Sequence, residues 1–200
     1  MEKNILRLFL YNRQMKFNEI EKQTKERSNK LAYHLQKLTK SGVLTKSKDF
    51  YTLSEKSEEK IPYLTEKKSL VPVIIIAIKK EGKIFLVKRE KRPFKNKLAL
   101  PGGRIVLGEN IPKATERIMN EKFGIKCKFE KINSISLEMV KNKKEVVHSF
   151  ILILVTAKTK DKLNYFDLNK SKRSVISSDY YLIKNDLDKE TKLQNLITKS

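Results

Sequence analysis

A glycine-rich stretch decides the fold of this 200-residue chain: Pro101-Gly102-Gly103-Arg104-Ile105-Val106-Leu107-Gly108-Glu109. Just after it, Asn110 is a residue type that caps helix N-termini, and Gly124 suits the left-handed conformation that ends helices. The stretch therefore predicts a loop, then a helix from about Ile111 to Phe123, then a sharp stop.

This stretch resembles the Nudix box, whose pattern is Gly, five residues, Glu, seven residues, then Arg-Glu-apolar-any-Glu-Glu-any-Gly-apolar. The matching positions are Gly103, Glu109, Arg117, Met119, Glu121, Gly124 and Ile125. Two positions depart from the pattern, because Ile118 and Lys122 replace its first and last clustered Glu. The resemblance implies a Nudix-type fold with an altered carboxylate cluster.

In active members of that family, the resemblance implies, clustered carboxylates hold divalent cations against a diphosphate. Positions 118, 121 and 122 are spaced i, i+3, i+4 and share one helix face. Only Glu121 remains there as a catalytic or Mg²⁺-binding candidate, and Mg²⁺ prefers oxygen ligands. A lysine beside the metal position repels the ion, so we expect little or no Mg²⁺-dependent hydrolysis. Glu116, Glu138 and Glu145 remain open as replacement ligands.

The resemblance also implies that Glu109 and Arg117 pair to brace the loop against the helix. The candidate ligand-binding residues are Gly102, Gly103, Arg104 and Lys122. The Lys122 ammonium could hold a diphosphate where the family places metal charge, since lysine binds phosphate as a point charge. Alternatively, Lys122 only projects into water at a helix C-terminus, where the helix dipole favours a cation.

Residues 1–62 predict three helices followed by a β-hairpin. The expected elements are a helix over Asn4–Tyr11, a second opening at Phe17 with Asn18 as its cap, a third from Ser28 to about Ser41, and strands Val43–Thr45 and Phe50–Leu53. This order and wording resemble the winged helix-turn-helix of archaeal and bacterial regulators that bind DNA as dimers. The resemblance implies a DNA-binding domain and a homodimer.

In such folds the third helix enters the major groove and the wing contacts phosphate. The candidate DNA-binding residues are Asn29, Lys30, Tyr33, His34 and Lys37 on the third helix, with Lys46 and Lys48 on the wing. A winged helix used for protein contacts is the alternative.

The rest of the chain predicts a linker over residues 63–70 and a second domain over residues 71–200. Apolar runs at Val71–Ile78 and Ile84–Lys88, and alternating runs at Phe129–Val140 and Val146–Ala157, indicate strands. A loop or lid over Thr159–Ser178, a final strand over Asp179–Ile183 and a closing helix capped by Asn185 complete the expectation. The predicted class is α/β (α+β), a winged helix followed by a Nudix-type α/β/α sandwich with a mixed sheet.

The chain is strongly basic, with a formal net charge of +22, which suits a polyanionic partner such as nucleic acid or nucleotides. Its only cysteine is Cys127, which excludes an intrachain disulfide. No apolar run is long enough to span a bilayer, so we expect a cytoplasmic protein. Three functions remain open: a DNA-binding regulator that senses a nucleotide-type ligand, a hydrolase of nucleoside diphosphates linked to another group, and a scaffold for protein partners.

Overall fold

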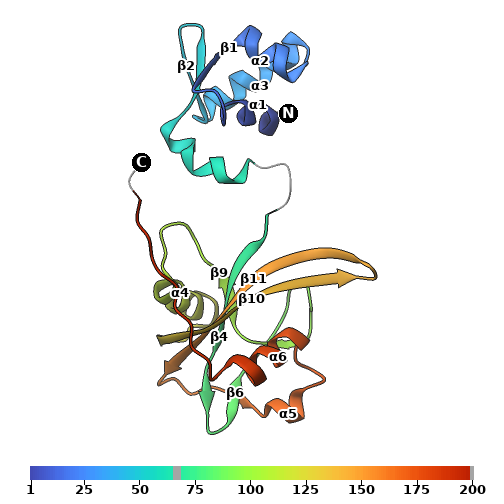
Figure 1. The fold of residues 1–200 in the computed structure, drawn as a ribbon, viewed down its shortest axis with the longest axis vertical. Helices are drawn as coiled ribbons and strands as arrows, with labels where there is room; N and C mark the ends of the chain where they lie inside the picture. Colours follow the sequence, from blue (N-terminus) through green and yellow to red (C-terminus); the bar gives the residue numbers. More distant parts are fainter. Residues whose placement is uncertain (65–68, 199–200) are drawn as a thin grey trace. The chain divides into compact units, whose positions relative to one another are not determined.

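The computed structural model describes residues 1–64 and 69–198, and residues 65–68 of the predicted linker lie outside the described residues. The chain divides into two compact units, Met1–Ser69 and Leu70–Ser200 (Figure 1). No helix in the described ranges combines the length and apolarity needed to cross a membrane.

The N-terminal unit contains three α-helices, a small sheet and a 3-10 helix. The helices are α1 (Glu2–Leu8), α2 (Phe17–Thr24) and α3 (Ser28–Lys40), and the 3-10 helix η1 covers Glu55–Tyr63. The antiparallel sheet has the order β1-β3-β2, with β1 at Gln14–Lys16, β3 at Phe50–Leu53 and β2 at Leu44–Ser47. Leu31, Leu35 and Leu38 of α3 are buried in the core of this unit because they recur on one helix face.

Two predicted boundaries in this unit are wrong. Helix α2 is preceded by β1 without a break, so its N-cap is Lys16 and Asn18 lies inside the helix. The Lys16 N–H donates to Glu19 Oε2 at 2.7 Å, which does the work expected of Asn18. Helix α1 ends at Leu8 rather than Tyr11, because the Asn12 side chain donates to the Leu8 carbonyl at 2.8 Å and satisfies the helix end.

The C-terminal unit is built on a mixed four-stranded sheet in the order β10-β11-β4-β9. The strands are β10 (Cys127–Asn142), β11 (Glu145–Thr159), β4 (Val71–Ala77) and β9 (Gly102–Arg104), and β4 runs parallel to β11 and antiparallel to β9. Helix α4 (Ile111–Phe123) packs on one face and α6 (Ser177–Asp186) on the other (Figure 1). The predicted Nudix-type sandwich with a mixed sheet is confirmed.

Strand β4 explains why the first apolar run is nearly continuous. Ile74 and Ile76 belong to the core cluster beneath α4, whereas Ile75 and Ala77 belong to the cluster beneath α6. Successive side chains of a strand point to opposite faces, so a strand covered on both faces needs apolar residues at every position.

Short elements complete this unit. They are β5 (Lys79–Lys80), β6 (Lys83–Phe85) and β12 (Tyr165–Phe166) in the order β12-β6-β5, the pair β7 (Val87–Lys88) and β8 (Leu98–Ala99), and helix α5 (Leu168–Ser171). The segment predicted as a loop over Thr159–Ser178 therefore contains β12 and α5, and its Val175 bridges to Leu98.

Two predictions near the C-terminus are wrong. Residues 179–183, predicted as a strand, lie in α6, because Asp179, Leu182 and Ile183 have helical spacing and all face the sheet. Asn185 lies inside α6 and starts no helix. The following tail is held in extended form instead, as the Thr191 N–H donates to the Ile132 carbonyl of β10 at 2.9 Å.

Candidate functional site

The helix at the centre of the site begins and ends as its terminal residues dictate. Asn110 Oδ1 accepts the Lys113 N–H at 3.0 Å and caps the start of α4. Gly124 ends the helix with a φ of 66°, which costs little without a Cβ. These two ends fix the register of α4, and hence which of its side chains face β9.

Glu109 and Arg117 join the glycine-rich loop to α4. Both guanidinium edges contribute, since Arg117 Nη2 donates to Glu109 Oε2 at 2.9 Å and Nε donates to Oε1. The same guanidinium donates to the Arg104 carbonyl at 3.0 Å and to Glu121 Oε2 at 3.1 Å, while Glu109 also accepts the Val106 N–H at 3.1 Å. The Arg117 hydrogen bonds hold the Glu109 pKa below its ordinary value, and the pair raises the pKa of Arg117.

Gly102 and Gly103 allow β9 to lie close to its neighbours. A Cβ on Gly102 would lie 2.6 Å from the Ile74 carbonyl oxygen, and one on Gly103 would lie 2.8 Å from Lys122 Nζ and 2.9 Å from Ile118 Cγ1. Both distances are shorter than real Cβ contacts. Any larger side chain would push the loop away from α4 and from the Lys122 ammonium.

Lys122 turns its ammonium back toward the glycine pair. Its Nζ donates to the Gly102 carbonyl at 2.7 Å. Desolvation lowers its pKa below the ordinary lysine value, and the neighbouring charges of Arg117, Lys91, Arg89 and Arg104 lower it further. No carboxylate in the described part of the chain forms an ion pair with Lys122.

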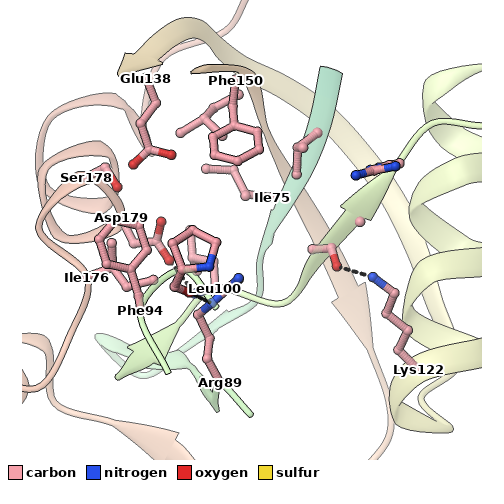
Figure 2. Close-up of a pocket in the computed structure, with 16 residues that line it drawn as sticks. Ile75, Arg89, Phe94, Leu100, Lys122, Glu138, Phe150, Ile176, Ser178 and Asp179 are labelled. Atoms are coloured by element: carbon pink, nitrogen blue, oxygen red, sulfur yellow. Dashed lines mark hydrogen bonds between the residues drawn. The ribbon is translucent and has the colours of Figure 1, made fainter. Parts of the chain in front are cut away.

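A cavity of about 220 Å³ opens between β9, the Arg89–Phe94 loop and the start of α6 (Figure 2). Its polar lining has two ends. Arg89, Arg104 and Lys122 supply positive charge, and Glu138 and Asp179 supply carboxyl groups. Figure 2 shows Glu138, Ser178 and Asp179 on one side and Lys122 on the other. The apolar lining includes Ile75, Pro93, Phe94, Leu100, Phe150 and Ile176.

Asp179 is the most deeply buried acid of the cavity, with 6% of its surface exposed. Burial raises its pKa to about 7, and the nearby charge of Glu138 adds to the rise. The Leu100 N–H, which donates to Asp179 Oδ2 at 2.7 Å, and the charge of Arg89 act in the opposite direction. The Asp179 carboxyl can therefore change its charge near neutral pH.

The structure separates the residues proposed from the sequence into two groups. Gly102, Gly103, Arg104 and Lys122 all line the cavity. Glu121 does not, because its exposed carboxylate turns to Arg117. Ile118 is fully buried in the core beneath Gly103.

These positions do not suit Mg²⁺. An isoleucine offers no ligand, an ammonium repels the ion, and the remaining carboxylate is held by a guanidinium. Among the described residues, no three His, Cys, Asp or Glu side chains are grouped to hold a metal. We therefore assign no step to a metal ion.

Of the acids left open as replacement ligands, only Glu138 lines the cavity. Sequence reasoning missed Arg89, Phe94, Phe150 and Asp179 as lining residues. The basic loop that contains Arg89 was visible in the sequence, but its approach to β9 depends on the β7–β8 pairing. A signal for Asp179 did exist, because it is an isolated acid in an apolar segment, and buried acids need partners.

The proposed DNA-binding residues are mostly exposed, but several already have partners. Lys37 Nζ donates to Glu2 Oε1 at 2.7 Å, and His34 Nδ1 lies 3.3 Å from the same atom. Lys30 pairs with Glu26 at 3.0 Å. Asn29 and Tyr33 lie exposed on α3, and Lys46 and Lys48 lie on the β2–β3 hairpin, with Lys46 Nζ 5.4 Å from the centre of the Tyr51 ring.

Comparison with known proteins gives a consistent result for the C-terminal unit. The model of a family described as NUDIX domain matches residues 68–170, about half of the chain. An ADP-ribose pyrophosphatase of Methanocaldococcus jannaschii is 34% identical over 77 residues, which are 38% of this chain and 46% of that protein. The chain thus matches less than half the length of this curated relative.

Solved structures also resemble the chain. A NUDIX hydrolase from Nitrosomonas europaea has a TM-score of 0.50 at 17% identity, covering 58% of this chain and 87% of that one. A MutT NUDIX hydrolase from Burkholderia pseudomallei has a TM-score of 0.48 at 16% identity, covering 58% and 98%. At these identities the first likeness establishes the fold alone.

Proposed function

We propose, from the premise that the chain belongs to the NUDIX family, that it is a DNA-binding transcriptional regulator that acts as a cytoplasmic homodimer. Its Nudix-type unit would sense a nucleotide or nucleoside-diphosphate-type ligand and hydrolyse it little or not at all. The N-terminal unit would bind duplex DNA as a winged helix.

The observation that carries the ligand-sensing part is the position of Lys122. Its ammonium points to the glycine pair, has one carbonyl acceptor and faces further cations at Arg89 and Arg104. Unmatched positive charge beside exposed backbone suits a phosphate group, which accepts charge-assisted hydrogen bonds. A diphosphate held in this way needs no divalent ion.

The experiment is calorimetric titration of ADP in excess EDTA. We expect binding to the native protein and a loss of affinity of about tenfold or more in Lys122→Glu, equivalent to about 1.4 kcal/mol. Lys113→Glu is the matched control, since Lys113 is an exposed lysine on the same helix outside the cavity, and it should bind as the native protein does. Equal affinity in Lys122→Glu, or binding only with Mg²⁺, contradicts the proposal.

The DNA-binding part is supported by the arrangement of α3 and the β2–β3 hairpin. A helix with an exposed basic face is followed by a two-stranded wing with lysines at its turn. Phosphate oxygens would replace the carboxylates that hold Lys30 and Lys37 in the free protein, because both are surface contacts that exchange readily. Glu2 then competes with DNA for Lys37.

A selection from random duplexes tests this part, followed by affinity measurements at several salt concentrations. Lys37→Ala should weaken binding and flatten the salt dependence, because one phosphate contact is lost. Glu2→Gln should strengthen binding a few-fold, since it frees Lys37 and removes a negative charge from this face. Lys22→Ala, an exposed lysine of α2, serves as the control. If no sequence is enriched and Lys37→Ala changes nothing, the unit serves protein contacts instead.

An active hydrolase is the second candidate, and two observations favour it. The curated relative is an ADP-ribose pyrophosphatase, and Glu138 lines the cavity as an acid outside the box. Mg²⁺-dependent cleavage of ADP-ribose that disappears in Glu121→Gln or Glu138→Gln would establish this function in place of ligand sensing. We expect negligible turnover in the native protein.

A further inference from the structure

The β10–β11 hairpin extends beyond the rest of its sheet (Figure 1). Strand β4 accompanies β11 only over Phe150–Thr156. The pairing of β10 with β11 continues further, to Asn142 opposite Glu145. Beyond Phe150 the two strands therefore form an arm without a neighbouring strand on the β4 side.

The outer edge of β10 is also free in this region. Strand β10 lies at the end of the sheet order, and the C-terminal tail reaches only its Ile132 carbonyl. Within residues 1–64 and 69–198, no backbone group outside the hairpin bonds to β10 from Ser134 to Val140. This segment pairs with β11 without a register shift, whereas shifts occur on both sides of it. A regular free edge is a template for another strand.

The same segment exposes an apolar face. Ile135, Leu137 and Met139 are 46%, 59% and 56% exposed and alternate along the strand, so they point to one side. Between Lys131 and Lys141 the strand has no basic residue, in a chain with 45 Lys and Arg. Charged side chains, above all lysine, are the usual protection of an edge strand, and this edge has only Glu138.

We propose that this edge pairs with the same edge of a second copy, antiparallel, with Leu137 on the two-fold axis. Leu137 then faces Leu137 of the second copy, and Ile135 faces its Met139, which joins both apolar stripes into one. On the opposite face Glu138 meets Ser136, which can donate a hydrogen bond to it. The inference names the contact surface of the homodimer in the proposed function, and its test requires neither DNA nor a nucleotide.

The charges along β10 select both the partner and the register. Moving the axis to Glu138 would place two Glu138 carboxylates opposite each other. Moving it to Ser136 would place Lys131 opposite Lys141. Like charges directly opposite each other destabilise a strand pair, whereas the axis at Leu137 opposes none from Asn133 to Lys141. The strand is complementary to itself in this register.

Disulfide trapping tests the register in a Cys127→Ser background, which removes the only native thiol. Directly opposite residues of antiparallel strands have Cα atoms about 4.5–5.5 Å apart, within the range a disulfide spans. Leu137→Cys should therefore form a covalent dimer under mild oxidation. Met139→Cys is the matched control on the same strand face, and its counterpart would lie about 13 Å away along the strand, so it should stay mostly monomeric.

Light scattering of the native protein and Leu137→Lys completes the test. The native chain should dimerise in a concentration-dependent way, as expected for a small interface, and Leu137→Lys should be monomeric at the same concentrations. A native monomer at every concentration contradicts the proposal. A dimer in which Met139→Cys crosslinks as readily as Leu137→Cys, or that survives Leu137→Lys, would place the interface elsewhere and leave DNA and ligand binding unaffected.

Discussion

Arg117 and Lys122 are two cations little more than one turn apart on α4, and their surroundings are opposite. Arg117 is matched by Glu109, Glu121 and the Arg104 carbonyl. Lys122 has one carbonyl acceptor and other cations nearby. Pairing pushes Glu109 and Arg117 toward their charged forms, whereas burial pushes Lys122 and Asp179 toward their neutral forms. The first pair stabilises the loop, and the cavity groups keep charge available for a ligand.

The largest expected effect is on the brace. Arg117→Ala leaves the Glu109 carboxylate, whose side chain is 15% exposed, without its main partner. We expect the free energy of unfolding to fall by about 3 kcal/mol, as when one member of a buried pair is removed. Urea unfolding measures this change. Lys122→Ala should cost less than about 1 kcal/mol, and similar losses in both variants would remove the distinction between the two cations.

A smaller effect should appear in the pH dependence of stability. Because the folded pKa of Asp179 is about 7, above its ordinary value of 3.8, the folded state binds a proton that the unfolded state has lost. Its contribution is fully present below pH 3.8 and declines as the pH rises toward 7. Asp179→Asn should remove this decline and raise the free energy of unfolding at pH 8 by about 2 kcal/mol or more. Unfolding curves between pH 4 and pH 8 that stay parallel for the two proteins would contradict this.

The smallest effect concerns the contact between the glycine pair and Lys122. In Gly103→Ala the new methyl group meets Lys122 Nζ and Ile118, and we expect a loss of about 1–2 kcal/mol from overpacking. The variant should also bind ADP more weakly, since the ammonium is displaced. Gly108→Ala is the control, because it has a φ of 82° but no neighbour within 4 Å. It should lose stability without a change in ADP affinity.

Much of the fold around α4 could be predicted because its signals are local. Asn110 and Gly124 act within one turn of their own positions, and the alternation of β10 and the apolar run of β4 reflect burial on one face or two. The errors fall where distant contacts decide. Residues 179–183 are apolar enough for a strand, but α6 forms because its buried side chains cover the sheet.

The sequence by itself determined the loop, the helix and the replacement of two carboxylates, since each depends on residue type and spacing within one segment. Only the tertiary structure decided what the replacements do. It directs Lys122 onto the Gly102 carbonyl, gives Glu121 to Arg117, and brings Asp179 and Glu138 to the far side of the same cavity. The physical reason is that charge acts through space. The pKa of each group depends on desolvation and on neighbours from other segments, and these are fixed only when β9, α4, β10 and α6 pack together.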